Sequence, residues 1–250
     1  IYNCIPNYSE MGKEATTGFT GIWNLMSGQV VANTTAVGTQ MLTGFNSSNA
    51  SFHRWATLYK YIRQGFIFLD NAKDYMGSEQ DVSYISKKDM DRLKAETKFL
   101  IAYSYFSLFE LYGPVPLITE IEDPENKTID YPRASVDEIV NYIDRLLQEV
   151  LDSNALPETL FTESASGSLD YEHNNDRYNL KEIVRPTKVT VLALRAKLWV
   201  YAASPLFNGG YGEALQLTNK DGKHLFPDED KTKWNTAKTH LETLFTFAEA

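Results

Sequence analysis

Cysteine is nearly absent from this sequence. Cys4 is the single cysteine among 250 residues, so an internal disulfide is excluded and cysteine spacing says nothing about the redox compartment. Long apolar runs are also lacking. The most apolar long stretch, residues 189–207, is interrupted by Arg195 and Lys197, so we predict that it does not span a bilayer.

An excess of positive charge is lacking as well. The formal net charge is −9 at pH 7, and the acidic residues are spread along the chain instead of forming one acidic tail. The sequence shows no basic run that offsets them. This charge balance argues against nucleic acid or an anionic membrane surface as a partner.

The sequence contains none of the common catalytic motifs. Its four histidines are far apart, and none stands in an H-E-x-x-H spacing. A G-x-x-x-x-G-K-[ST] phosphate loop and a G-x-S-x-G nucleophile elbow are both missing. No nucleophile therefore stands out in the sequence, and the expectation that the protein is not an enzyme depends mainly on the family resemblance given below. Two distant carboxylates that meet in the fold, as in a glycosidase, are not excluded by sequence alone.

One acidic cluster is a candidate for a metal site. Asp228, Glu229 and Asp230 offer oxygen ligands of the kind that calcium prefers, although the spacing is not that of an EF-hand. Asp230 is also placed to cap a helix that starts near Lys233. We favour the cap, and therefore expect no cofactor, with calcium at Asp228 and Asp230 as the alternative.

Helical periodicity dominates what is present, and residues 92–112 carry it most strongly. Phe99, Ala102, Tyr103 and Phe106 follow the i, i+3, i+4, i+7 spacing of one helix face. The opposite face is hardly more polar, which predicts a central helix with packed neighbours on most sides. Gly113 and the proline after it end this helix.

Four further helices are predicted from period and end signals. The first runs from Trp55 to about Tyr75, the second begins after a capping-box pattern at Ser135, and the third covers residues 189–203, with Pro186 in its first turn. The fourth begins near Trp234. A small-residue row in the third predicts close packing: Ala193, Ala196 and Ala203. The central helix also has a capping-box pattern, at Ser86. The expected fold class is therefore mainly α, with helical hairpins stacked side by side.

Two long regions lack helical periodicity: residues 1–51, before the predicted helices, and residues 152–184, between two of them. They are rich in Ser, Thr, Asn and Gly, and such excursions often carry function. Aromatic faces can lie against sugar rings while amides bond to the hydroxyls. The candidate ligand-binding residues are Trp23, Phe45, Asn46, Asn49 and Tyr171. The alternative, which we favour for Trp23 and Phe45, is that these rings pin the region to the helices.

Residues Ala95 to Leu117 resemble the signature of the SusD/RagB family of Bacteroidetes. They follow the pattern A-E-x-x-F-L-x-A-Y-x-Y-F-x-L-x-x-x-Y-G-x-V-P-L. Residues 55–69, 131–157 and 185–210 are similar to the neighbouring segments of that family, in the same order. One departure is Phe66, where the family commonly has Asn. The resemblance implies a tetratricopeptide-like scaffold with long irregular insertions, and it implies that residues 1–250 are the N-terminal portion of one SusD-like domain whose C-terminal half is absent.

The resemblance also implies a function. Proteins of this family are cell-surface lipoproteins of the outer membrane that capture a nutrient, most often a glycan, without turnover. They pass it to a SusC-like TonB-dependent transporter. We expect the lipid anchor of this protein to lie outside residues 1–250, because the residues before Cys4 do not resemble a signal-peptidase site. Two alternatives stay open: a peptide-binding uptake lipoprotein, and a tetratricopeptide-like adaptor that binds proteins.

Overall fold

The computed structural model describes residues 54–73, 84–121, 130–158 and 185–249, together with residues 2, 5 and 125. The chain divides into two compact units, residues 1–61 and 62–250. The helices are α3 (Trp55–Asn71), α4 (Lys87–Tyr112), α5 (Val136–Asp152), α6 (Lys188–Ala203), α7 (Gly212–Leu215) and α8 (Lys233–Glu249). Among the described residues no strand forms, only an isolated bridge between Thr218 and His224. The expected mainly α class is confirmed.

Helix α3 begins in the first unit and continues into the second. In the first unit Leu58 is fully buried, and the rings of Trp55 and Tyr59 lie 5.2 Å apart. The helix ends at Asn71 and not at Tyr75 as predicted. The reason is that its apolar period stops at Leu69, so no further turn has a face to bury.

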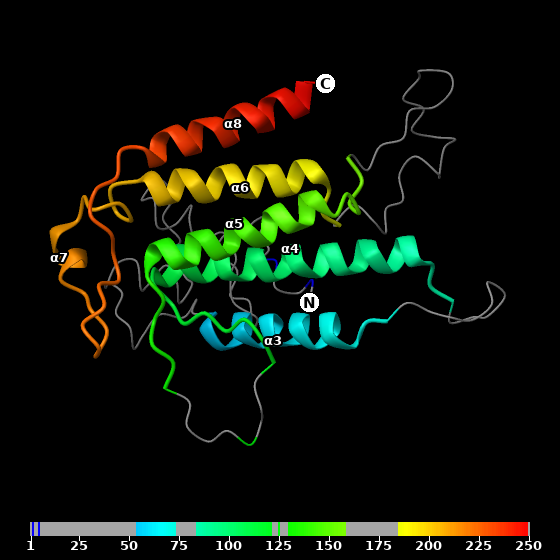
Figure 1. Cartoon of the computed structure of the whole chain (residues 1–250), viewed down its shortest axis with the longest axis horizontal. Helices are drawn as coiled ribbons and strands as arrows, with labels where there is room; N and C mark the ends of the chain where they lie inside the picture. Colours follow the sequence, from blue (N-terminus) through cyan, green and yellow to red (C-terminus); the bar gives the residue numbers. More distant parts are fainter. Residues whose placement is uncertain are drawn as a thin grey trace, which may run out of the picture. The chain divides into compact units, whose positions relative to one another are not determined.

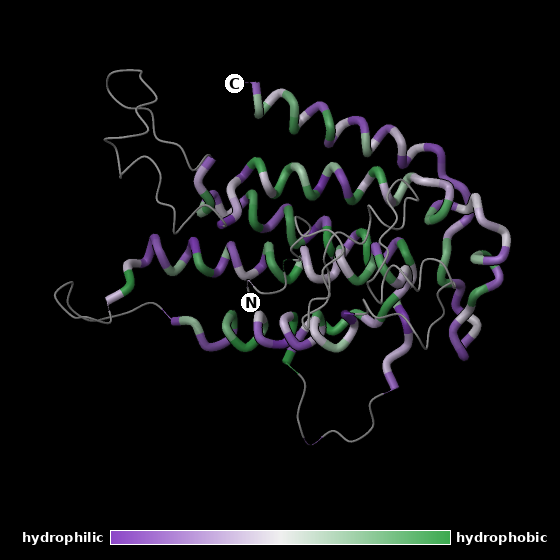
Figure 2. Tube along the Cα trace, turned by 180° about the vertical axis from the view of Figure 1, so that it is seen from behind, coloured by the Kyte–Doolittle hydropathy of each residue, from purple (hydrophilic) through white to green (hydrophobic). Residues whose placement is uncertain are grey.

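Helix α4 is the central helix that the sequence predicts. The Ser86 hydroxyl oxygen accepts the Asp89 N–H and caps its start, and Gly113 ends it in a left-handed conformation with φ of 66°. Between residues 95 and 109 every side chain is buried except Lys98 and Tyr103. Figure 2 shows hydrophilic first turns in α4, followed by hydrophobic ones. Burial on all sides of the later turns confirms the prediction.

In the second unit α4, α5, α6 and α8 lie side by side in chain order and run in alternating directions (Figure 1). Helix α5 packs against α4 and α6, and α8 packs against α6. Gly65 of α3 brings that helix against α4, since a Cβ at this position would stand 2.7 Å from Cγ1 of Ile101. These antiparallel neighbours are the stacked helical hairpins that the periodicity predicts.

The start and the packing of α6 differ in part from prediction. Pro186 precedes the helix, and Thr187 is the N-cap, exchanging hydrogen bonds with Thr190. Because the Thr187 side chain already accepts the Thr190 N–H, the helix begins after it and not at the proline. The small-residue row is also only partly buried: Ala196 and Ala203 are buried, whereas Ala193 is exposed.

A polar cluster joins three neighbouring helices, α5, α6 and α8. Arg195 of α6 donates two hydrogen bonds to the Asp144 carboxylate of α5, at 2.6 and 2.9 Å, and a third to Gln148. Trp199 donates to the same carboxylate at 2.8 Å, and its ring stacks on His240 of α8. Burial alone would raise the pKa of Asp144, but the bonds from Arg195 and Trp199 outweigh it and lower that pKa. Burial, with the charge of Arg195 adding to it, lowers the pKa of His240.

Candidate functional site

The residues that the sequence singles out for ligand binding lie outside the described residues. They are Trp23, Phe45, Asn46, Asn49 and Tyr171. Their role as ligand contacts therefore stays a prediction, and the candidate site described below is built from other residues.

The segment between α6 and α8 carries the candidate site. Residues 217–225 fold back on themselves: Leu225 N–H donates to the Leu217 carbonyl, Asn219 N–H to the Lys223 carbonyl, and Gly222 N–H to the Asn219 carbonyl. Gly222 has φ of 85°, a conformation that a residue with a side chain rarely adopts. We call residues 217–225 the return loop. In sequence, only the turn-forming pair Asp221-Gly222 signals it.

Long-range bonds fasten the return loop to the segment before α5. The Asn219 side chain donates to the Arg133 carbonyl at 2.8 Å, and Lys220 forms an ion pair with Asp130 at 2.9 Å. The backbone N–H of Val136 donates to the Leu225 carbonyl at 2.9 Å. The side-chain partners are 86 and 90 residues apart in sequence, so only the fold brings them together.

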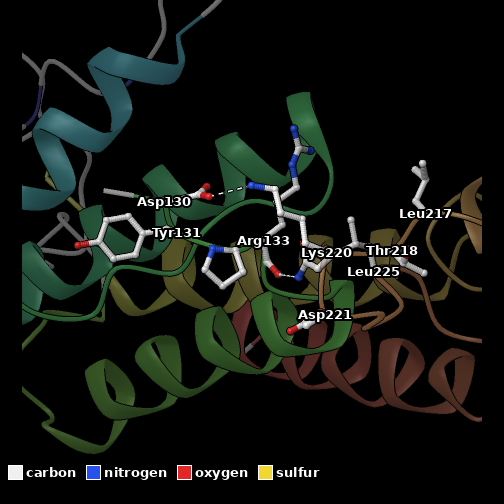
Figure 3. Close-up of a pocket in the computed structure, with 10 residues that line it drawn as sticks. Asp130, Tyr131, Arg133, Leu217, Thr218, Lys220, Asp221 and Leu225 are labelled. Carbon is white, nitrogen blue, oxygen red and sulfur yellow. Dashed lines mark hydrogen bonds and ion pairs between the residues drawn. The ribbon is translucent and has the colours of Figure 1, made fainter. Parts of the chain in front are cut away.

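An open cavity of about 590 Å³ lies between these two segments. We call it the loop groove, and Figure 3 shows its side chains, with Lys220 reaching across to Asp130. Its lining residues are Asp130–Arg133, Leu217–Asp221 and Leu225. Within the described part of the chain, the Thr218 hydroxyl and Oδ2 of Asp221 have no hydrogen-bond partner, whereas Oδ1 of Asp221 accepts the Lys223 N–H.

The chemistry of the loop groove suits a polar, uncharged ligand. Its ion pair Lys220–Asp130 cancels one charge of each sign. A hydroxyl, a carboxylate oxygen and the Tyr131 ring are the groups that bond to sugar hydroxyls and cover sugar rings. The groove therefore has the features of a shallow glycan surface, without a nucleophile and general base in hydrogen-bond contact.

Asp230 of the acidic cluster holds the turn before α8. Its Oδ1 accepts the backbone N–H and the hydroxyl of Thr232, at 2.8 and 2.6 Å. These bonds lower the pKa of Asp230. Because α8 begins only at Lys233, the role of Asp230 as the helix cap stays a prediction. Among the described residues no group of three or more His, Cys, Asp or Glu side chains is placed to hold a metal ion. Asp228 lines a hollow together with His224, and neither residue lines the loop groove.

No helix in the part of the chain that the structure describes has both the length and the apolarity to cross a membrane. None of the curated proteins compared with this chain matches it. A SusD-like family model, described as starch-binding and associating with the outer membrane, matches residues 11–168, which is more than half of the chain.

Solved structures of SusD-like proteins resemble the chain in fold. BT4246 aligns with a TM-score of 0.65 and 26% identity over 87% of this chain and 33% of its own length. A SusD homolog from Bacteroides thetaiotaomicron VPI-5482 aligns with a TM-score of 0.55 and 21% identity, over 84% of this chain and 32% of its own. The chain thus spans about a third of the length of the structures it matches. It belongs to the SusD-like family, whose members are non-catalytic carbohydrate-binding proteins associated with the outer membrane.

Proposed function

We propose that this chain is part of a cell-surface lipoprotein that captures a glycan and delivers it to a SusC-like TonB-dependent transporter in the outer membrane. Family membership supports glycan binding and an outer-membrane location. The observation that carries the proposal to particular residues is the loop groove, an open hollow that combines hydroxyl and charged side chains with apolar ones. Such a surface accepts an extended oligosaccharide more readily than a compact cofactor.

In this proposal the helices hold the loop groove in place, and all of its lining residues lie outside the helices. The return loop supplies the Thr218 hydroxyl and the Asp221 carboxylate as hydrogen-bond partners, while the Tyr131 ring covers a sugar face. Trp23, Phe45, Asn46, Asn49 and Tyr171 remain proposed contacts for further sugar units. Capture without turnover requires only that the ligand leaves unchanged.

Calorimetric titration of the full chain tests this function. The ligands are a maltooligosaccharide, as a linear neutral glucan, and a mixture of peptides. Two double variants separate the two candidate surfaces: Thr218→Val with Asp221→Asn, and Trp23→Ala with Phe45→Ala. The first pair keeps the Asp221 oxygen that accepts the Lys223 N–H, so the return loop stays closed.

We expect saturable binding of the glucan with no product formed. Because each hydrogen bond contributes at least about 0.5–1.5 kcal/mol and the loop-groove pair alters two of them, this pair should raise the Kd roughly 5- to 150-fold. A Kd that changes only in the Trp23 and Phe45 pair would place the ligand on the first irregular region. Binding of peptides alone would replace glycan capture by the peptide-uptake or adaptor alternative, and measurable product would revive the glycosidase alternative.

A further inference from the structure

A second hollow, of about 540 Å³, lies beside residues 132–134 and shares Pro132 and Arg133 with the loop groove. We call it the arginine groove. Side chains of α5, the return loop and the segment before α5 surround it. Its lining residues are Leu117, Pro132, Arg133, Ala134, Glu138, Asn141, Tyr142, Arg145 and Lys223.

Two of the four charges in this groove cancel. Lys223 of the return loop contacts both carboxylate oxygens of Glu138 at 2.5 Å. The hydrogen bond from Lys223, more than any other contact, lowers the pKa of Glu138, so this carboxylate is ionised at neutral pH. This ion pair holds the return loop against α5 and leaves no net charge.

The two arginines are different, because within the described part of the chain neither has a carboxylate partner. Arg133 donates one hydrogen bond, from Nη1 to the Pro114 carbonyl at 3.0 Å. Arg145 lies over the Tyr142 ring, with its guanidinium carbon 5.2 Å from the ring centre. Both side chains are exposed. The groove therefore carries a net charge of +2 on a chain whose formal net charge is −9.

The surroundings preserve this positive charge and hold it in place. Tyr142 is buried, and burial raises its pKa to about 12, so the phenol adds no negative charge. The aromatic ring positions the Arg145 guanidinium through a cation–π contact. A guanidinium has five N–H donors in a planar fork that matches the two oxygens of a carboxylate, and each arginine keeps most of these donors.

From this geometry we propose that the arginine groove binds the carboxylate of a uronic acid unit in an acidic glycan. The proposal rests on the glycan-capture function above and narrows its substrate class. The neighbouring loop groove would hold uncharged parts of the same glycan, because the two hollows meet at Pro132 and Arg133. Asn141, which also lines the arginine groove, offers an amide to the hydroxyls of the acidic sugar.

A matched pair of ligands tests the carboxylate directly. Oligogalacturonate with free acid groups is compared with its fully methyl-esterified form, which has the same rings and linkages but no charge. Calorimetry on the full chain is expected to give at least about tenfold tighter binding of the free acid, since bonds to charged groups contribute more than neutral ones. That difference should shrink as salt is added.

Protein variants then assign the effect to the two arginines. Arg133→Gln with Arg145→Gln should weaken binding of the free acid at least about tenfold. The methyl ester is tested on Arg145→Gln alone, since Arg145 does not line the loop groove, and its binding should be unaffected. Lys231→Gln with Lys238→Gln is the control, because it removes the same charge from two exposed lysines that do not line either groove. The single variant Arg145→Gln leaves the Arg133 bond to Pro114 intact and should still weaken binding of the free acid.

Several results would overturn this assignment. They are equal affinity for the two ligand forms, equal losses in the arginine and lysine variants, or binding of sulfated glycans or acidic peptides without uronates. If neutral glucans bind and oligogalacturonate does not, the arginine groove proposal fails while glycan capture stands. If no glycan binds at all, both proposals fail.

Discussion

The polar cluster of α5, α6 and α8 gives the sharpest stability prediction. Asp144→Asn keeps the size of the side chain but removes the charge that accepts two hydrogen bonds from Arg195 and one from Trp199. The substitution therefore tests the electrostatic link between the helices without opening a cavity. The helical scaffold that positions both grooves depends on this link between α5 and α6.

The expected cost follows from burial. A hydrogen bond to a charged group contributes about 1.5–3 kcal/mol, and breaking a buried ion pair costs about 3–5 kcal/mol. The Arg195 and Asp144 side chains keep 14% and 20% of their surface exposed, so water replaces part of what is lost, and Gln148 still accepts a bond from Arg195. We expect the free energy of unfolding to fall by about 2 kcal/mol.

Urea denaturation at neutral pH, monitored by circular dichroism, measures this loss in the free energy of unfolding. Asp91→Asn is the matched control, because it makes the same change in an exposed i, i+4 pair with Lys87. Such a surface pair contributes at most about 0.5 kcal/mol. If Asp144→Asn costs no more than Asp91→Asn, the carboxylate does not link the helices and the reasoning is wrong.

Three further predictions concern other parts of the scaffold. Tyr105→Phe should lower the free energy of unfolding by about 1–3 kcal/mol in the same assay and increase hydrogen exchange at the Ile118 N–H. The reason is that the Tyr105 hydroxyl donates to the Ile118 carbonyl at 2.6 Å and accepts the Ile118 N–H at 2.9 Å. Unchanged exchange at Ile118 would contradict this. Gly65→Ala should lower the free energy of unfolding by about 1 kcal/mol, because the clash of the new Cβ with the buried Ile101 costs more than the better helix propensity of Ala gains. In an Ile101→Ala background the clash is absent, and Gly65→Ala should be neutral or stabilising. Burial lowers the pKa of His240, so the unfolded chain binds this proton at higher pH than the folded chain. Stability should therefore fall as pH drops from about 6.5 toward the folded pKa, and His240→Gln should remove that part of the pH profile.

The sequence alone determined α3, α4, α5, α6 and α8, because a helix is specified by residues within a few turns of one another, whereas the short helix α7 was not predicted. The capping box at Ser135 and Glu138 is present in both directions, and α4 begins and ends at Ser86 and Gly113 as predicted. The errors are local too. Thr187 caps α6 with Thr190 in place of the usual Glu or Gln, so the local pattern favours the proline before it as the first turn, which the structure does not show.

Family membership was also readable from sequence, since the signature in residues 95–117 is contiguous. The ligand residues predicted from composition, such as Trp23 and Tyr171, stay predictions. An aromatic residue in an irregular region has the same sequence signal whether it packs or binds.

Only the tertiary structure decided where the two grooves lie. Asp221-Gly222 is a turn-forming pair, but no pattern in the sequence indicates that this turn fastens to Asp130 and Arg133, about ninety residues earlier. The sequence has no basic patch, yet within the residues that the structure describes Arg133 and Arg145 have no carboxylate partner, whereas Lys223 is paired with Glu138. Periodicity reports which face of a helix is buried. Which distant loops meet at the helix ends depends on the packing of the whole array, and local sequence does not encode that packing.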